Sequence, residues 1–127
     1  DVVLPQGASV LNADDPHVLE LAEYSDGEVL LYSLEPDHPA LAAHRARKGR
    51  ALVARGQQIL LLQGAETVVQ ADLGGADFSA FSTDLPEDIR PHVLAAAGAA
   101  WALGVPVDLI HAGLLRFGEP QSASLVH

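Results

Sequence analysis

The 127-residue chain contains neither cysteine nor methionine. Without Cys there are no disulfide bonds, no thiolate metal ligands and no cysteine nucleophile. A chain free of Cys fits the cytoplasm, where thiols stay reduced, and we expect that location. Because the chain lacks Met and has Asp at position 1, we also expect a mature or excised segment rather than a native start.

Basic residues are also scarce. Seven Lys and Arg stand against seventeen Asp and Glu, so the formal net charge is −10 at pH 7. A phosphate backbone repels so acidic a chain, and we therefore expect no nucleic-acid partner. No apolar run reaches the roughly 18 residues of a membrane span, so we expect no membrane contact either. Hydrophobic residues still make up 49% of the chain, enough for the core of one modest domain.

Several common active-site motifs are missing as well. There is no Gly-x4-Gly-Lys-Ser/Thr phosphate loop, and LGGAD at 73–77 lacks the lysine. Three serines (Ser79, Ser82 and Ser122) have no strand–turn–helix elbow around them. The six histidines form no His-Glu-x-x-His zinc motif; they are His17, His38, His44, His92, His111 and His127. Taken alone, the residues predict no catalytic residue, no metal ligand and no complete active site.

The first third of the chain alternates strand and helix signals. The apolar stretch 9–12 predicts a strand. Asp15-Pro16 then predicts a helix start, with Asp as the N-cap and Pro at the first helical position. The apolar face of that helix is expected at Val18, Leu21 and Ala22. The continuous apolar run 28–34 is typical of a second, buried strand.

The middle of the chain predicts one more helix followed by a hairpin. His38-Pro39 opens the helix, basic residues fill its last turn, and Gly49 is expected at the C′ position. Residues 50–64, RALVARGQQILLLQG, predict two strands that turn at Arg55-Gly56-Gln57. Residues 66–73 predict a further strand.

The last third is expected to be helical after an irregular stretch from Gly74 to Arg90. The segment HVLAAAGAAWALG at 92–104 is almost entirely small and apolar, so we expect a helix buried on most faces. Gly98 would allow a neighbour to approach closely. A second helix follows Pro106 and ends at Gly118, with its apolar stripe at Val107, Ile110, Leu114 and Phe117. The two helices are expected to pack as an antiparallel pair on one side of a sheet.

These elements predict an α/β fold with a mixed sheet, parallel at its start and antiparallel at the hairpin. We expect a single domain or part of one, divided into four regions. Residues 1–75 carry the strands, the first helices and the hairpin, 76–91 a loop, 92–118 the helix pair and 119–127 a tail.

Asp14 and Asp15 follow the first predicted strand and have two interpretations. Adjacent carboxylates point in different directions and rarely share a proton or an ion, which favours a cap and a solvated carboxylate. The ends of parallel strands are also where α/β folds bind ligands, which favours a role in a site.

The order of the segments resembles a known family. VLNADDP is followed by DGEVLLYSL, then AAHRARKGRALVARGQQILLLQG, then VLAAAGAAWALGVPVDLIHAGLLRFG. This set resembles the central domain of the Mur ligase family, in the version that cyanophycin synthetases carry, and covers residues 7–118. The resemblance implies part of a Rossmann-like ATPase domain, namely its C-terminal half.

The resemblance also implies an activity for a longer parent protein. Such enzymes are ATP-dependent amide ligases that use a phosphate loop and Mg²⁺ to make an acyl phosphate, which an amine then attacks. The implied substrates are Asp, Arg and a growing polypeptide. The phosphate loop, the Mg²⁺ ligands and a modified lysine would precede Asp1, and a C-terminal domain would follow His127. ATP and Mg²⁺ would therefore serve the parent, with none expected on this segment alone, and its partners would be the other parent domains or a second copy.

Four residues carry over to a nucleotide site by resemblance. Asn12, Asp14 and Asp15 match the family's Asn-x-Asp-Asp turn on the nucleotide side of the sheet. His92 stands where the family usually has an Asn that contacts adenine. An imidazole can stack on a purine or bond to it, but it lacks the paired donor and acceptor of an amide.

Three hypotheses remain open at this stage. The chain is a segment of a cyanophycin-synthetase-like ligase that is inactive alone, or a non-catalytic interaction module derived from a ligase domain, or a small free-standing enzyme such as a hydrolase. A phosphate loop upstream in the parent gene would support the first hypothesis. The third needs a deep pocket that gathers at least two of His17, His92 and His111.

Overall fold

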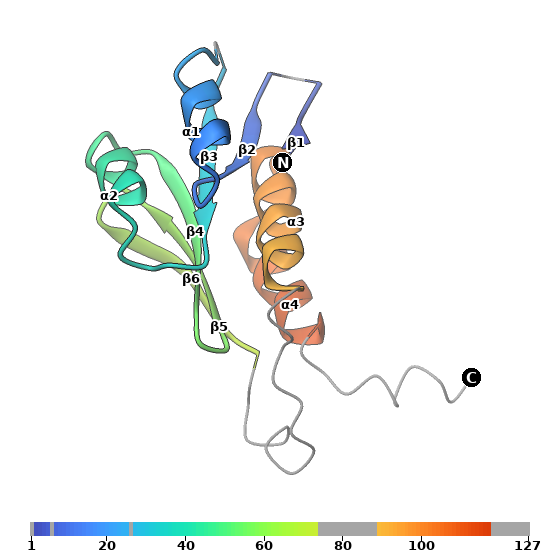
Figure 1. Ribbon diagram of the computed structural model, residues 1–127. Helices are drawn as coiled ribbons and strands as arrows, with labels where there is room; N and C mark the ends of the chain where they lie inside the picture. Colours follow the sequence, from blue (N-terminus) through green and yellow to red (C-terminus); the bar gives the residue numbers. More distant parts are fainter. Residues whose placement is uncertain (1, 6, 26, 74–88, 118–127) are drawn as a thin grey trace.

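A computed structural model describes residues 2–5, 7–25, 27–73 and 89–117 (Figure 1). These residues form one mixed sheet whose six strands lie side by side in chain order. The strands are β1 (Val2–Val3), β2 (Ser9–Asn12), β3 (Val29–Ser33), β4 (Arg50–Arg55), β5 (Gln58–Gln63) and β6 (Glu66–Asp72). The helices are α1 (Pro16–Ala22), α2 (Pro39–Ala46), α3 (Arg90–Ala102) and α4 (Val107–Phe117). The predicted α/β class is confirmed, and the arrangement is consistent with part of a Rossmann-like domain.

Strand direction changes along the sheet as the sequence predicts. β2, β3 and β4 are parallel neighbours, and α1 and α2 provide the crossovers that parallel strands need. β4, β5 and β6 are antiparallel, and the short β1 pairs antiparallel with β2. The β4–β5 turn is Gly56-Gln57, and Gly56 has a φ of 60°, which glycine adopts without strain.

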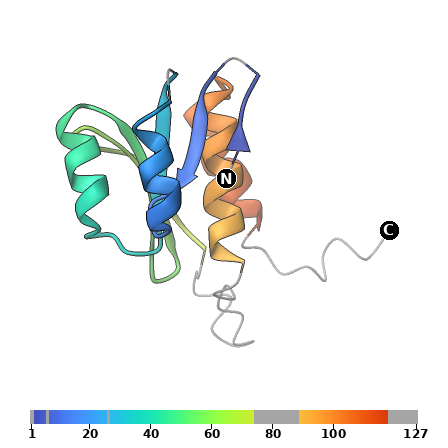
Figure 2. The same cartoon turned by 45° about the horizontal axis from the view of Figure 1, so that its top comes forward.

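Two layers of helices cover the sheet (Figures 1 and 2). On one face, α3 and α4 bury Val10, Leu30, Leu52 and Leu61 in the larger core cluster. On the other face, α1 and α2 cover the smaller cluster around Leu41. Because both faces of the parallel strands are covered, their apolar runs are continuous and not alternating.

The predicted apolar face of α1 is partly wrong. Val18 and Ala22 pack against the core, but Leu21 is 65% exposed. Leu19 takes its place in the packed face. The helix has only seven residues and packs against β2. Leu19 and Leu21 flank the Val18 and Ala22 stripe on opposite sides, so a rotation of about 50° decides which of them faces inward.

The predicted C′ position of α2 is also wrong by one residue. The C-cap is Arg47, so Lys48 and not Gly49 occupies the left-handed conformation, with a φ of 66°. Gly49 is required for a different reason. The ring of His44 lies directly against its Cα, so a side chain at this position would clash with the imidazole.

α3 begins at Arg90, earlier than the predicted His92, and Pro91 is part of its first turn. Its buried residues form one face only: Val93, Leu94, Ala97, Gly98 and Trp101. The expectation of a helix buried on most faces is therefore wrong, since Ala96 and His92 are exposed. The expected close approach at Gly98 is confirmed, because a Cβ there would lie 2.6 Å from Val10 Cγ1.

α4 returns along α3 on the same face of the sheet (Figures 1 and 2). Ile110 and Leu114 of the predicted stripe are buried and Val107 is half-buried. The side chain of Phe117 lies outside the described residues, as do most of the predicted loop 76–91 and the predicted tail 119–127. The four-region division of the chain stays a prediction.

Candidate functional site

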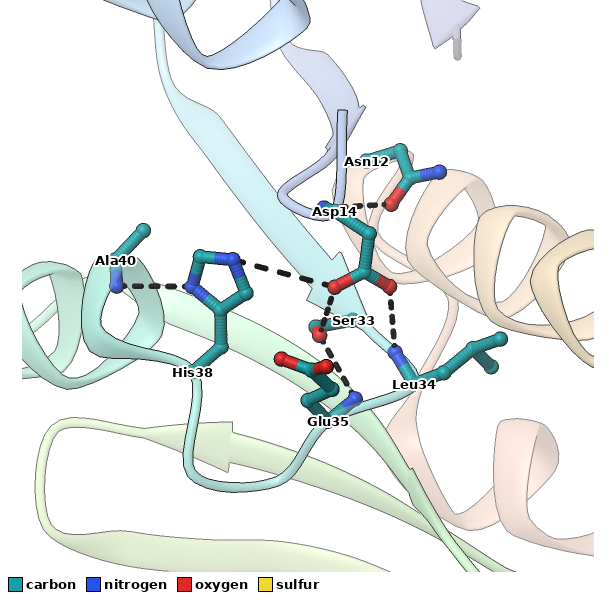
Figure 3. A network of polar contacts seen from close by, with 7 residues as sticks. All are labelled: Asn12, Asp14, Ser33, Leu34, Glu35, His38 and Ala40. Atoms are coloured by element: carbon teal, nitrogen blue, oxygen red, sulfur yellow. Dashed lines mark hydrogen bonds and ion pairs between the residues drawn. The ribbon is translucent and has the colours of Figure 1, made fainter. Parts of the chain in front are cut away.

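The polar groups singled out from the sequence lie where two parallel strands end. β2 ends at Asn12, and β3, its parallel neighbour, ends at Ser33. The chain leaves both strands at the same edge of the sheet, which in α/β folds is the edge where ligands bind. Figure 3 shows the polar network that forms between the two turns.

Asp14 joins the two turns directly. Its Oδ1 accepts a hydrogen bond from Ser33 Oγ at 2.6 Å, and its Oδ2 accepts one from the Leu34 amide at 2.9 Å. Ser33 is fully buried, and its Oγ also accepts from the Glu35 amide at 2.8 Å. Hydrogen bonds to a carboxylate are stronger than those between neutral groups. Asp14 therefore holds the turn after β2 and the turn after β3 in one fixed arrangement.

The neighbouring residues Asn12 and Asp15 serve their own turn. Asp15 Oδ1 accepts from the His17 amide at 3.0 Å and caps α1, as the Asp-Pro pattern predicts. Asn12 Oδ1 accepts from the Asp14 amide at 2.9 Å. The two aspartates thus point to different partners, and the carboxylate of Asp14 is used to bridge strands rather than being only solvated.

His38 completes the network from the start of α2. Its Nδ1 accepts a hydrogen bond from the Ala40 amide at 3.0 Å and caps the helix. In a neutral imidazole with an accepting Nδ1, the proton is on Nε2. That Nε2 lies 4.0 Å from Asp14 Oδ1, which is too far for a direct hydrogen bond. The Nε2–H group of His38 therefore lies near the Asp14 carboxylate without a direct hydrogen bond to it.

This cluster resembles a metal site in composition but does not fit one well. Ligand atoms of Asp14, Glu35 and His38 lie within 4.8 Å of one another. To bind an ion through Nε2, His38 would need its proton on Nδ1, and it would lose the hydrogen bond from Ala40 that caps α2. The misfit therefore lies at His38, because each oxygen of Asp14 accepts one hydrogen bond and keeps a further lone pair. Asp14 and His38 already hold the local backbone, and we call the hydrogen bond between Asp14 and Ser33 the brace of this edge.

Tyr32 lies beneath the network, next to the end of β3, and is almost completely buried. Burial raises the pKa of its phenol, and the negative charge of Asp14 raises it further. Tyr32 consequently stays protonated at neutral pH and can act at this edge only as a neutral hydroxyl.

His92 comes from α3, whereas the other three predicted site residues come from the end of β2 and the turn after it. Arg50, at the start of β4, donates to the carbonyl of Trp101 near the end of α3, so α3 runs opposite to the parallel strands. The first turn of α3 therefore lies toward the edge where β2 and β3 end. There His92 lines an apolar groove of about 390 Å³ between α3 and α4, and not the Asp14 network. A hydrolase pocket would need at least two of His17, His92 and His111, and of these only His92 lines this groove.

Sequence reasoning missed the partners of Asp14. Ser33 has a recognisable signal, because a Ser that ends the buried run VLLYS places a hydroxyl at the edge of the sheet. For His38 the sequence predicts a helix start and no zinc motif, but nothing in it indicates a position beside Asp14. Its proximity to Asp14 depends on the register between β2 and β3, which the sequence does not specify.

Comparison with known proteins gives one consistent group of relatives. No family model matches the chain. The cyanophycin synthetase of Synechocystis sp. is 31% identical over 124 residues, and that of Crocosphaera subtropica is 32% identical over 124 residues. The cyanophycin synthetase of Geminocystis herdmanii is 29% identical over 113 residues. The chain is similar to a segment of cyanophycin synthetases.

The similarity covers most of this chain but little of its relatives. It spans 92% of the chain and 13% of the Synechocystis and Crocosphaera proteins, and 87% of the chain and 12% of the Geminocystis protein. The relatives therefore contain other regions that this sequence does not represent. Among the described residues, no helix has the length and apolar character needed to cross a bilayer.

Proposed function

We propose that the chain is one segment of an ATP-dependent amide ligase of the Mur ligase type that resembles cyanophycin synthetase. The observation that carries the proposal is the 31–32% identity with two such synthetases over 92% of the chain. The fold is compatible with this assignment, because a parallel α/β sheet places its loops at one edge, where nucleotides bind. The location would be the cytoplasm.

In such a ligase, ATP and Mg²⁺ convert a carboxylate to an acyl phosphate with release of ADP. An amine then attacks the acyl carbon, and phosphate leaves as the amide bond forms. The segment would contribute Asn12, Asp14 and Asp15 from the turn after β2, and His92 from α3. The brace between Asp14 and Ser33 would keep that turn in one conformation as substrates bind and leave.

The proposed parent supplies what this segment lacks. No Gly-Lys-Thr phosphate loop occurs in the sequence, so we expect the isolated chain to be inactive. The other parent domains would be its first partners, and a second copy would be the alternative partner. Asp, Arg and a growing polypeptide would be the substrates, by likeness to the cyanophycin synthetases.

The test is a ligase assay on the full-length product of the gene that contains this segment. We expect phosphate release that requires ATP, Mg²⁺, Asp, Arg and a polypeptide primer together. His92→Ala should raise the KM for ATP, whereas His111→Ala on α4, which does not line the groove, should leave it unchanged. A folded full-length protein that releases no phosphate under these conditions would contradict the proposal.

The second candidate is a non-catalytic interaction module derived from a ligase domain. It is favoured by His92 at the position of the family's Asn and by the apolar groove along α3 and α4. It predicts a full-length protein that has no phosphate loop upstream of Asp1 and binds no ATP. The same expression and assay therefore distinguish the two candidates.

A further inference from the structure

The groove between α3 and α4 is apolar along its length. Several small residues, including Ala96, Ala100 and Gly113, line it and leave it open. A Cβ built on Gly113 would meet no atom within 4 Å. Leu109, which lines it, is 62% exposed, a large fraction for a leucine of a packed helix. The lining residues are Ile89, His92, Val93, Ala96, Ala97, Ala100, Val105, Leu109, Ile110, Gly113 and Leu114. Contiguous exposed apolar surface of this kind marks an interaction site.

The backbone chemistry of the groove restricts what can occupy it. Both walls are α-helices, whose mid-helix N–H and C=O groups are already paired with each other. An extended peptide would find no backbone partners there and would bury unpaired polar groups. A helix satisfies its own backbone and can present a ridge of apolar side chains to the groove. Ala96, Ala100 and Gly113 let the backbone of such a helix come close.

We propose that an amphipathic helix from the remaining part of the parent chain occupies this groove. The inference rests on the proposed function, because it takes the parent to be as long as the relatives, of which this segment spans 13%. The helix would place an apolar ridge over Ala96, Ala100 and Gly113 and turn its polar face to solvent.

The size of the groove and the charge of the chain favour a tethered occupant over a second copy. A stable complex between separate molecules uses about 20–30 residues on each side. The groove is lined by eleven residues, so it would be a small part of such an interface. A tethered segment is present at an effective concentration on the order of millimolar, so a small contact is sufficient. Two copies that each carry a net charge of −10 also repel each other.

Hydrogen exchange measured by mass spectrometry tests this inference. Backbone amides of residues 93–102 and 107–116 are compared between the 127-residue chain and the full-length gene product at the same pH and temperature. We expect exchange to be at least tenfold slower in the full-length protein, because a docked helix restricts local opening of α3 and α4. The antiparallel β4–β5 hairpin, which the groove does not touch, serves as the internal reference.

A matched pair of substitutions on α4 locates the effect. Gly113→Leu places a large side chain in the groove at a position where the Cβ meets no atom within 4 Å, and it should abolish the difference in exchange. Ala112→Leu adds a leucine at an exposed position of the same helix that does not line the groove, and it should leave the difference intact. Thermal melts of both variants in the 127-residue chain verify that each still folds.

Each remaining outcome contradicts the inference. Equal exchange in the short and full-length proteins would mean that nothing docks in the groove. Slower exchange that depends on the concentration of the short chain would assign the groove to a second copy. Protection that survives Gly113→Leu would place the contact elsewhere on the helices. Failure of the proposed function shows separately, as absence of ATP-dependent phosphate release from a protein whose helices are nevertheless protected.

Discussion

Gly98 is the position at which the backbone of α3 packs directly on the sheet. A Cβ there would lie 2.6 Å from Val10 Cγ1 and 3.3 Å from Leu52 Cδ1, and both residues are fully buried. Val10 has a short, branched side chain that cannot move aside, so Gly98→Leu should overpack the contact. We expect a loss of about 1–3 kcal/mol in the free energy of unfolding, measured by urea denaturation.

The control for Gly98 is the other glycine in the helix pair. Gly113→Ala adds a methyl group in open space and removes the flexibility of glycine from a helix. It should raise stability by up to about 1 kcal/mol. If both substitutions had the same effect on stability, the close contact between Gly98 and Val10 would be contradicted.

The bond between Asp14 and Ser33 should behave as a coupled unit. Asp14→Ala leaves the fully buried Ser33 hydroxyl without its carboxylate acceptor and should cost about 1–3 kcal/mol of stability. Ser33→Ala in the Asp14→Ala background should cost much less than Ser33→Ala alone. A double-mutant cycle by denaturant unfolding should give a coupling energy of about 0.5–3 kcal/mol. Additive effects would show that the two side chains act independently.

His44 should make stability depend on pH. Burial is the largest effect on its imidazole and lowers the pKa, and the charge of Arg47 also lowers it. Hydrogen bonding with the backbone of Val29 opposes burial more strongly than Arg47 assists it, and the backbone of Arg50 and the charge of Glu28 oppose it less, so the pKa remains lowered. The unfolded state, with a pKa of about 6.5, therefore takes up a proton before the folded state does. Stability is complete above that pH and falls as the pH drops below it toward the lowered folded value.

The measurement is the change in Tm between pH 7.5 and pH 5.5. His44→Phe retains a flat ring against Gly49 but has no titrating group, so its Tm should fall less than that of the unsubstituted chain. His111→Phe removes a different histidine and serves as the control. An equal fall in Tm for the His44→Phe variant and the unsubstituted chain would contradict the assignment to His44.

At the scale of elements, one side chain fixes the end of α3 to the starts of β3 and β4. The Arg50 guanidinium pairs with Glu28 through two nitrogens, at 2.7 and 2.5 Å. It also donates to the Trp101 carbonyl at 3.2 Å and lies 4.9 Å from the centre of the Trp101 ring. The same carbonyl accepts from the Gly104 amide at 3.1 Å, so Arg50 adds a second, charged hydrogen bond at the C-terminal end of the helix.

Arg50→Ala should therefore be much more damaging than removal of its partner. We expect a loss of about 1.5–3 kcal/mol from the charged hydrogen bond to Trp101, with a further part from the ring contact. Glu28→Ala should cost at most about 1 kcal/mol, because the Glu28 side chain is 48% exposed and water screens the pair. Urea denaturation of both variants decides the order, and a larger loss for Glu28→Ala would contradict this account.

The elements themselves could largely be predicted from the sequence, because their signals are local. The Asp-Pro and His-Pro pairs cap α1 and α2, and Gly56 lies in the hairpin turn. What could not be predicted depends on contacts between elements. Leu21 is exposed because the orientation of α1 is set by the sheet, and α3 has one buried face because α4 covers only part of the other.

In the candidate site, too, local features could be predicted from the sequence and contacts between elements could not. The capping role of Asp15 is local and was predictable, whereas the bond from Ser33 to Asp14 spans nineteen residues. It exists because β2 and β3 pair with Asn12 opposite Tyr32, which brings the two turns together. A parallel register of this kind carries no local sequence signal, so the brace becomes visible only in the folded chain.

At the scale of the whole molecule, charge and composition together determine whether the isolated chain should bind a nucleotide. The net charge of −10 opposes the approach of a polyanion such as ATP. The described residues that could contact it are a turn whose carboxylates are already bonded and an imidazole in an apolar groove. Neither supplies the cradle of amides and lysine that holds phosphates in a phosphate loop.

Isothermal titration calorimetry with ATP and Mg²⁺ tests whether the 127-residue chain binds nucleotide. We expect no measurable heat at micromolar nucleotide, while the full-length gene product should bind under the same conditions. The salt dependence is a further check, because relief of repulsion at higher ionic strength should not by itself produce binding. Micromolar affinity in the short chain would contradict an incomplete site. In that case His92→Ala should be compared with His111→Ala, since loss of binding in the first variant alone would show that the His92 side chain contacts the nucleotide.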